Sequence, residues 1–230
     1  MKFMKISMVV ALAASLFVSS CNMSNTGKGA LIGGGGGAGL GAGIGALIGG
    51  GKGAAIGAGV GAAVGAGAGA LIGNKMDKQK KELEEQLANA NVQETTDANG
   101  LKAIRVTFPG GILFQTGKWA INASAQAELK QFAASLKQND LTDVRIFGYT
   151  DNTGSMAANE KVSTNRANAV EQFLANQGVA MSRMQAKGLP MQDYLNDNAT
   201  AADRAQNRRV EIYIYASEQM IKDAEAGTLK

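Results

Sequence analysis

A charged residue on the apolar side of a predicted helix is the clearest indication of chemistry in this 230-residue sequence. Apolar residues at helical spacing predict a helix over residues 157–176, and Arg166 lies four residues after Val162, on or beside the apolar stripe. A guanidinium there needs a partner, because burial of an unpaired charge is costly. Asn159 and Ser163 lie on the same side nearer the helix start, so this end of the helix is suited to an anion.

A carboxylate lies in the loop before this helix. Asp151 directly follows a predicted strand over residues 143–150, and loops at strand ends commonly bind ligands. Asp151 and Arg166 are fifteen residues apart. Two interpretations are open for them, a shared site for a charged ligand and an ordinary salt bridge that fixes the loop.

The composition excludes several classes of site. The chain has no His and one Cys, which excludes His-dependent triads, disulfide frameworks and cysteine-based zinc sites. Without residues 1–20 it has 21 basic and 19 acidic residues, and no basic stripe with interleaved aromatic residues predicts nucleic-acid binding. We expect no enzyme activity, metal or cofactor, because no nucleophile stands with a suitable base.

Residues 1–20 predict a secretory signal peptide, because their apolar run of about 13 residues is shorter than the ~20 needed to cross a bilayer. The sequence VSSC, which ends at Cys21, resembles a bacterial lipobox. The resemblance implies cleavage before Cys21 and its lipidation, with palmitate as an expected acyl group. Asn22, where Asp often directs inner-membrane retention, favours the outer membrane. The alternative is an A-x-A-like cleavage site with a chance cysteine nearby.

Residues 27–74 are a tandem duplication rather than a linker. Residues 27–50 and 51–74 align without gaps, are identical at 17 of 24 positions, and have glycine at every fourth residue. On a helix this spacing places the glycines in one groove, which lets a partner backbone approach closely. We expect a helical hairpin embedded or oligomerised in the membrane; a compact periplasmic helix pair and a flexible spacer are the alternatives. Residues 75–91 predict a solvated connector helix.

Further motifs carry a resemblance to a known family. They are the run GYTDNTG from residue 148, Asn159, Ser163, Arg166 with Ala167, Gly188, and the run NRRVEI from residue 207. With these spacings, residues 92–216 resemble the OmpA C-terminal peptidoglycan-binding domain. The whole chain is similar to the YiaD-like glycine-zipper lipoproteins.

The resemblance implies a ligand and a set of contacts. The family holds the zwitterionic end of meso-diaminopimelate, in the peptide stem of peptidoglycan, between an Asp and an Arg whose positions match Asp151 and Arg166. A carboxylate suits the ammonium, and a planar guanidinium suits the carboxylate. The same resemblance implies further contacts from Thr153, Asn159 and Arg208.

Two features of this region qualify the match. Gln115 and Gly117 stand where family members commonly have Asp and a polar residue such as Asn. For Arg208 and Arg209, a solvated strand end remains an alternative to a binding role. The alternating Tyr213 and Tyr215 indicate packing on the sheet surface rather than a platform for sugars.

The expected fold class is α+β, an OmpA-like βαβαβ sheet with helices packed on it, preceded by the all-helical glycine-zipper hairpin. Asn99-Gly100 predicts a β-hairpin between residues 92–96 and 101–108. A further helix is expected over residues 122–137, and strands near residues 184–187 and 209–215. The tail, residues 217–230, is expected to extend the domain as a helix.

The expected function is non-covalent peptidoglycan binding by a lipid-anchored outer-membrane protein whose C-terminal domain lies in the periplasm. Peptidoglycan and outer-membrane lipid are the expected partners, with a homo-oligomer through the glycine zipper as a further candidate. The alternative is a membrane-embedded oligomeric or pore-like assembly that wall binding positions. A cell-wall hydrolase is the third hypothesis.

Overall fold

The computed structural model describes residues 66–97, 100–115 and 117–230. The expected signal peptide, Cys21 and most of the expected glycine-zipper hairpin lie outside these residues. None of the helices within the described ranges has the length and apolar character of a membrane span.

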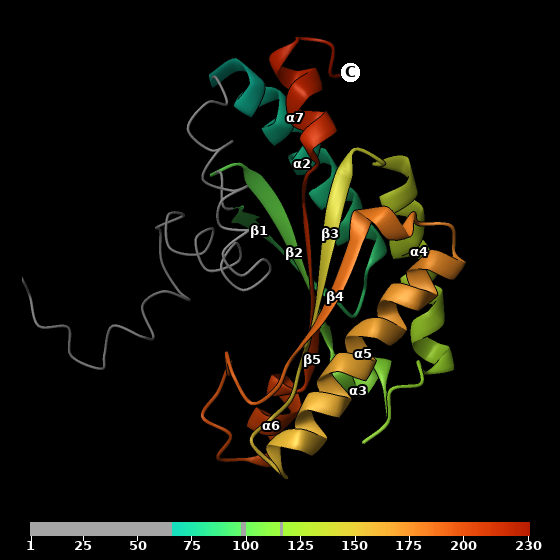
Figure 1. Cartoon of the computed structure of the whole chain (residues 1–230), viewed down its shortest axis with the longest axis vertical. Coiled ribbons are helices and arrows are strands. Elements are labelled where there is room, and N and C mark those ends of the chain that lie inside the picture. The colour runs from blue at the N-terminus through green and yellow to red at the C-terminus, as the bar shows by residue number, and fades with distance from the viewer. Residues whose placement is uncertain (1–65, 98–99, 116) are drawn as a thin grey trace, which may run out of the picture. The chain divides into compact units, whose positions relative to one another are not determined.

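In the described part of the chain, a five-stranded mixed sheet forms the centre of the domain (Figure 1). Its strands lie in the order β1-β2-β5-β3-β4, and all neighbours are antiparallel except β3 and β4, which are parallel. The expected α+β class, hairpin and strands are confirmed. The strands are β1 (Asn91–Thr96), β2 (Lys102–Pro109), β3 (Thr142–Tyr149), β4 (Met184–Leu189) and β5 (Arg209–Ala216).

Two long helices cover one face of the sheet. They are α4 (Ala123–Gln138) and α5 (Met156–Asn176), which correspond to the two helices expected from apolar spacing. Phe132 of α4 meets Phe108 of β2 edge-to-face, with ring centroids 5.8 Å apart. The same face buries alternate residues of β3 and β5 completely: Val144, Ile146, Val210, Ile212 and Ile214.

Three short elements were not expected from the sequence. They are α3 (Gly110–Leu113), the 3-10 turn Met181–Arg183 and α6 (Ala201–Asn207). Their lengths of four, three and seven residues give too few turns for a helical period to be visible.

Helix α2 (Ala66–Gln86) runs from the end of the glycine repeat into the expected connector without a break at residue 74. Ile72, Met76 and Leu83 are buried on one side of α2, which contacts α4, β1, β2 and α7 (Glu218–Glu225). The interpretation of a solvated connector is therefore wrong. The buried stripe begins before residue 75, so the connector taken alone showed only part of it.

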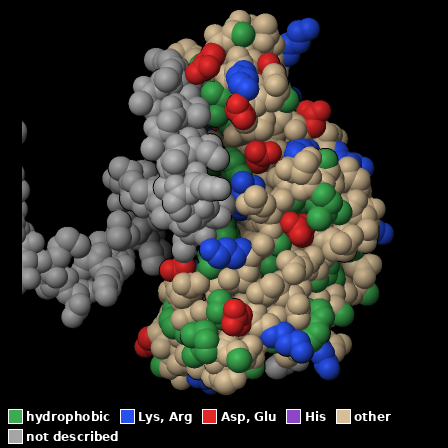
Figure 2. Space-filling model, in the orientation of Figure 1, with side chains coloured by type: hydrophobic (Ala, Val, Ile, Leu, Met, Phe, Trp, Pro, Cys, Tyr) green, Lys and Arg blue, Asp and Glu red, His purple; other side chains and the backbone are tan. Residues whose placement is uncertain are grey.

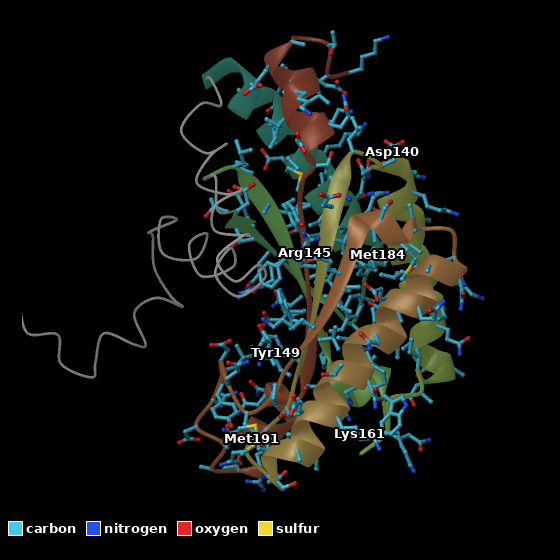
Figure 3. The ribbon with its side chains drawn as sticks, in the orientation of Figure 1. Asp140, Arg145, Tyr149, Lys161, Met184 and Met191 are labelled. Carbon is cyan, nitrogen blue, oxygen red and sulfur yellow. The ribbon has the colours of Figure 1, made fainter. Side chains whose placement is uncertain are left out.

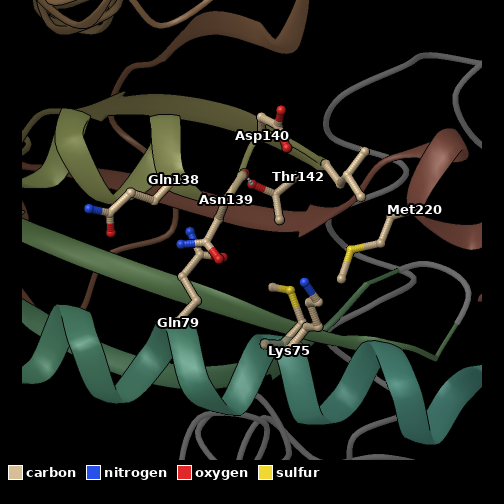
Figure 4. A pocket seen from close by; sticks show the side chains of 9 residues that line it. Lys75, Gln79, Gln138, Asn139, Asp140, Thr142 and Met220 are labelled. Carbon is tan, nitrogen blue, oxygen red and sulfur yellow. Dashed lines mark hydrogen bonds between the residues drawn. The ribbon is translucent and has the colours of Figure 1, made fainter. Parts of the chain in front are cut away.

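A small polar cavity separates α2 from the end of α4 and the start of β3 (Figure 4). Its volume is about 40 Å³, and Gln138 and Asn139 help to line it. Gln79 of α2 is 1% exposed, and its Nε2 has no hydrogen-bond partner among the described residues. The cavity adjoins the start of β3, whereas Asp151 follows the end of that strand.

The close approach of α5 to the sheet depends on two paired glycines. Gly148 of β3 lies opposite Gly188 of β4. A Cβ atom at Gly148 would lie 2.2 Å from the carbonyl oxygen of Ser163, and one at Gly188 would lie 2.4 Å from Oγ1 of Thr164. The absence of side chains here lets Ser163 pack on the sheet with no solvent exposure.

We expect Gly148→Ala to lower the free energy of unfolding by about 1–3 kcal/mol, because the new methyl group must displace the backbone of α5. Gly111→Ala is the matched control, since a Cβ atom at Gly111 meets nothing within 4 Å. Thermal denaturation followed by circular dichroism compares the two variants. A Gly148→Ala melting temperature equal to that of Gly111→Ala would contradict this account of the packing.

Candidate ligand-binding site

The expected site residues meet at one end of the sheet. Asp151 follows β3, α5 begins shortly afterwards at Met156, and Arg208 lies between α6 and β5. Figure 1 shows the end of β3, the start of α5 and helix α6 together at the lower end of the domain. Figure 3 labels Tyr149, the last residue of β3, in this region.

Asp151 is a nearly buried carboxylate with hydrogen bonds to both of its oxygens. Oδ1 accepts from the backbone N–H of Thr153 at 2.9 Å and from its hydroxyl at 2.5 Å. Oδ2 accepts from Nη1 of Arg208 at 2.5 Å, in an ion pair whose side chains are 4% and 34% exposed, respectively. Burial raises the pKa of Asp151, but the bonds from Thr153 and Arg208 outweigh it, so the net pKa lies below its ordinary value.

Asn159 fixes the loop that carries Asp151. Its Nδ2 donates to the carbonyl oxygen of Thr153 at 2.7 Å and to that of Ser155 at 3.1 Å. The hydroxyl of Ser155 accepts from the N–H of Ala158 and caps the start of α5. Asn159 therefore positions the carboxylate of Asp151 indirectly, by holding the loop. Its amide nitrogen already donates two hydrogen bonds to that loop.

Arg166 is 3% exposed and held by the chain between α3 and α4. Its Nε donates to the carbonyl oxygen of Lys118 at 3.0 Å, Nη2 reaches that of Gln115 at 3.5 Å, and its guanidinium lies 5.1 Å from the ring centroid of Phe114. Burial and the charge of Arg208 lower the pKa of Arg166, while Asp151 raises it. The three charges thus act on one another, although within the described residues Asp151 pairs with Arg208 and not with Arg166.

Part of the Arg166 guanidinium is not used by these contacts. The group has five N–H donors, and its Nη1 has no hydrogen-bond partner among the described residues. The contacts that hold it use backbone carbonyl oxygens, so they do not depend on which side chains stand at Gln115 and Gly117. The departure from the family pattern at these two positions leaves the support of Arg166 in place.

Arg209 is a structural residue, and the interpretation of a solvated strand end is wrong for it. Its Nε donates to Glu211 at 2.6 Å, and both side chains are 3–4% exposed. The guanidinium lies 3.8 Å from the ring centroid of Tyr149, and its Nη2 donates to the carbonyl oxygen of Asp193 at 2.9 Å. Tyr213 donates its hydroxyl to the other oxygen of Glu211 at 2.8 Å. This network fixes the start of β5, next to Arg208.

Asn207 organises the loop between β4 and α6. It is fully buried, and its Oδ1 accepts from the N–H groups of Leu195 and Asn196 at 2.8 and 3.1 Å. Its Nδ2 donates to Asn196 and to Oδ1 of Asn198, which also accepts from the N–H of Asn152. The β4–α6 loop is thereby joined to the loop that carries the carboxylate.

Two aromatic residues of the site were not identified from the sequence. Phe114 lies beneath Arg166, and burial, with a smaller effect from the charge of Asp151, raises the pKa of Tyr194. Phe114 is one of several apolar residues that precede α4, so nothing in its spacing marks this contact. Tyr194 lies in the β4–α6 loop, which has no regular period.

Comparison with known proteins gives two matches to family models. Residues 113–208 match the OmpA family, and residues 1–81 match the YMGG-like Gly-zipper. The first range contains Asp151, Thr153, Asn159, Arg166 and Arg208.

Curated relatives match part of their length. The chain is 38% identical over 125 residues to outer membrane porin F of Pseudomonas aeruginosa, which is 53% of this chain and 36% of the relative. It is 34% identical over 140 residues to YiaD of Escherichia coli, a probable lipoprotein, with 61% of this chain and 63% of the relative covered. The chain thus spans from about a third to just under two thirds of these relatives.

Solved structures have the same fold. A MotB-like protein from Desulfovibrio vulgaris superposes with a TM-score of 0.55 at 22% identity, over 62% of this chain and 92% of that chain. The cell wall anchor of the T6SS from Pseudomonas aeruginosa superposes with a TM-score of 0.50 at 27% identity, over 62% of this chain and 97% of that chain. The matched family consists of non-enzymatic structural proteins. The chain is therefore similar to the OmpA family through residues 113–208 and to the YMGG-like Gly-zipper through residues 1–81.

Proposed function

We propose that the protein is an outer-membrane lipoprotein whose OmpA-family domain binds peptidoglycan non-covalently and ties the membrane to the wall. The group recognised is the free end of diaminopimelate in the peptide stem, which carries one ammonium and one carboxylate. One observation supports the proposal: the nearly buried carboxylate of Asp151 is paired with Arg208 and is near enough to the buried Arg166 for its charge to raise the pKa of that guanidinium.

The charges of the site match such a group. One carboxylate and two guanidinium groups give a net charge of +1, which favours a ligand that brings a carboxylate as well as an ammonium. In the proposed complex the ligand ammonium contacts Asp151, and the ligand carboxylate contacts the available Nη1 of Arg166. Charge-assisted hydrogen bonds of this kind, made in a partly desolvated site, are the strong ones.

Arg208 has a second part in this proposal. Its Nη1 donates to Oδ2 of Asp151, the oxygen that the ligand ammonium contacts in this proposal. Its side chain is one third exposed, so it has room to move aside and meet the ligand carboxylate. Arg208 therefore acts as an internal substitute for the ligand ammonium, and its removal should cost less affinity than removal of Asp151.

The comparisons support the cellular setting. One relative is a probable lipoprotein and another an outer membrane porin, and the structure similar at 27% identity is a cell wall anchor. Lipidation at Cys21 and periplasmic exposure of the domain are part of the proposal, and Cys21 lies outside the described residues.

Sedimentation with isolated peptidoglycan sacculi tests the function. The protein, purified in detergent, is incubated with sacculi, and the pellet and the soluble fragments are analysed. If the protein is a tether, it is recovered in the pellet with the sacculi and releases no soluble muropeptides. New soluble muropeptides would indicate a hydrolase, and absence from the pellet would end the proposal.

A pore-like or oligomeric assembly remains the second candidate, because residues 1–81 match the YMGG-like Gly-zipper. Crosslinking in native membranes separates the two. Higher oligomers that form without sacculi, and that persist when Asp151 is replaced, would favour assembly as the primary role.

We expect binding to sacculi to be nearly constant between about pH 5 and pH 8. The chain has no His, and the depressed pKa of Asp151 keeps its carboxylate ionised until the pH falls below the ordinary value of 3.8. The contribution of this carboxylate to binding and to stability is therefore fully present above its ordinary pKa of 3.8, and it is lost as the pH falls through the lower folded-state pKa. Sedimentation at a series of pH values measures this, and a midpoint between pH 5 and pH 7 would contradict the assignment of Asp151.

A further inference from the structure

The loop that holds Arg166 also presents an exposed indole. Trp119 is 40% exposed and is the sole tryptophan of the chain. It follows Lys118, whose carbonyl oxygen accepts the hydrogen bond from Arg166. Trp119 is thus a large amphipathic ring on the surface, one residue from a contact of the candidate site.

The loop holds this ring on a fixed base. Phe114 and Ile121 form an antiparallel bridge across it, and the N–H of Asn122 donates to the carbonyl oxygen of Leu113 at 2.8 Å. Because Arg166 binds the carbonyl oxygens within the loop, the site and the ring are positioned by the same contacts.

A hollow of about 460 Å³ opens beside the ring, within the range of roughly 300–1,000 Å³ that small-molecule sites have. It is lined by Gln115, Lys118, Trp119, Ala120, Ile121, Asn122 and Ala123. Nζ of Lys161 lies 5.9 Å from the centroid of the Trp119 ring, so the surroundings are cationic as well as aromatic. Figures 2 and 3 together show basic side chains at the lower end of α5, where Lys161 is labelled.

We propose that Trp119 and the hollow beside it bind an amino-sugar ring of the peptidoglycan glycan strand. This inference rests on the proposed function, because the sugar is joined to the stem whose end is held at Asp151 and Arg166. The negative face of an indole attracts the C–H groups of a sugar ring. Lys118 and Lys161 suit the carboxylates that the peptide stem carries near its attachment to the sugar.

Fluorescence titration tests the proposal, because all tryptophan emission comes from Trp119. The probes are a diaminopimelate-containing stem peptide and the disaccharide muropeptide with the same stem, added to the full chain in detergent. We expect the muropeptide to bind about tenfold more tightly than the peptide and to change the emission more strongly.

Variants separate a sugar contact from support of the loop. Affinities of the variants are measured by calorimetry, since Trp119→Ala has no tryptophan. Trp119→Ala should lower the affinity for the muropeptide to that for the stem peptide and leave the affinity for the peptide unchanged. Trp119→Phe should keep part of the difference in affinity between the muropeptide and the stem peptide. Met181→Ala removes another exposed apolar side chain, 50% exposed, and should change neither affinity.

The outcomes distinguish this inference from the proposed function. Equal affinities of the wild type for the two probes, or an equal loss of both in Trp119→Ala, would overturn the sugar contact while the peptide site stands. Failure of both probes to bind would overturn the proposed function as well.

Discussion

Replacing Asp151 with Ala is expected to weaken binding to sacculi by about 2–5 kcal/mol, at least about thirtyfold in Kd. The ligand ammonium would lose its carboxylate, and Arg166 and Arg208 would face each other without a negative charge between them. Arg166→Ala should cost a similar amount, because the ligand carboxylate loses its guanidinium. The double variant should lose little more binding free energy than either single variant, since the two residues together bind one group.

Conservative and matched variants sharpen this result. Arg166→Lys keeps the charge but loses the planar fork and should bind nearly as poorly as Arg166→Ala. Arg208→Ala should lose less affinity for sacculi than Asp151→Ala or Arg166→Ala, because the variant also leaves Oδ2 of Asp151 free to accept from the ligand ammonium. Glu85→Gln and Lys130→Ala remove single charges from exposed positions outside the site and should bind as the wild type does.

Circular dichroism and melting temperatures must show that the site variants are folded. With that established, sedimentation of both Asp151→Ala and Arg166→Ala at wild-type affinity would refute the site.

Glu211→Leu is expected to lower the free energy of unfolding by about 3–5 kcal/mol. Glu211 and Arg209 form a buried ion pair at 2.6 Å, and the removal of one member leaves the other charge buried without its partner. The hydroxyl of Tyr213 also loses its acceptor. Urea denaturation followed through the emission of Trp119 measures the loss as a lower midpoint.

The exposed ion pair of α7 supplies the control for this prediction. Glu218 and Lys222 are 2.7 Å apart with side chains 77% and 62% exposed, so Glu218→Gln should not shift the midpoint measurably. Glu211→Gln keeps the side-chain shape and one acceptor oxygen for Arg209 without the charge, so its midpoint should lie between those of the wild type and Glu211→Leu. A Glu211→Leu midpoint equal to that of Glu218→Gln would contradict the structural role of the pair.

The central fold was predictable because its elements have clear periods. The apolar spacing of α4 and α5 and the alternation in β2, β3 and β5 are properties of each segment alone. Helices α3 and α6 are too short to show a period. The buried stripe of α2 crosses an apparent boundary at residue 74 between two very different compositions, so only the folded chain shows that Ile72 and Leu83 belong to one packed face.

The sequence indicated which residues come together in the candidate site, but not how they pair. Asp151, Arg166 and Arg208 stand at recognisable spacings, yet spacing cannot say which arginine reaches the carboxylate. That choice depends on backbone carbonyl oxygens from Gln115 and Lys118, which every residue type has and no sequence pattern marks. The same holds for Asn207, whose four hydrogen bonds go to a loop of irregular conformation.

Calorimetry with two stem peptides, identical except for diaminopimelate or lysine at the third position, tests the central claim most directly. The lysine side chain offers an ammonium but no second carboxylate, so only the diaminopimelate peptide can engage Asp151 and Arg166 together. We predict that the diaminopimelate peptide binds about tenfold more tightly or better, and that Asp151→Asn weakens its binding at least about tenfold. Equal affinity for the two peptides, or unchanged binding in Asp151→Asn, would contradict the account.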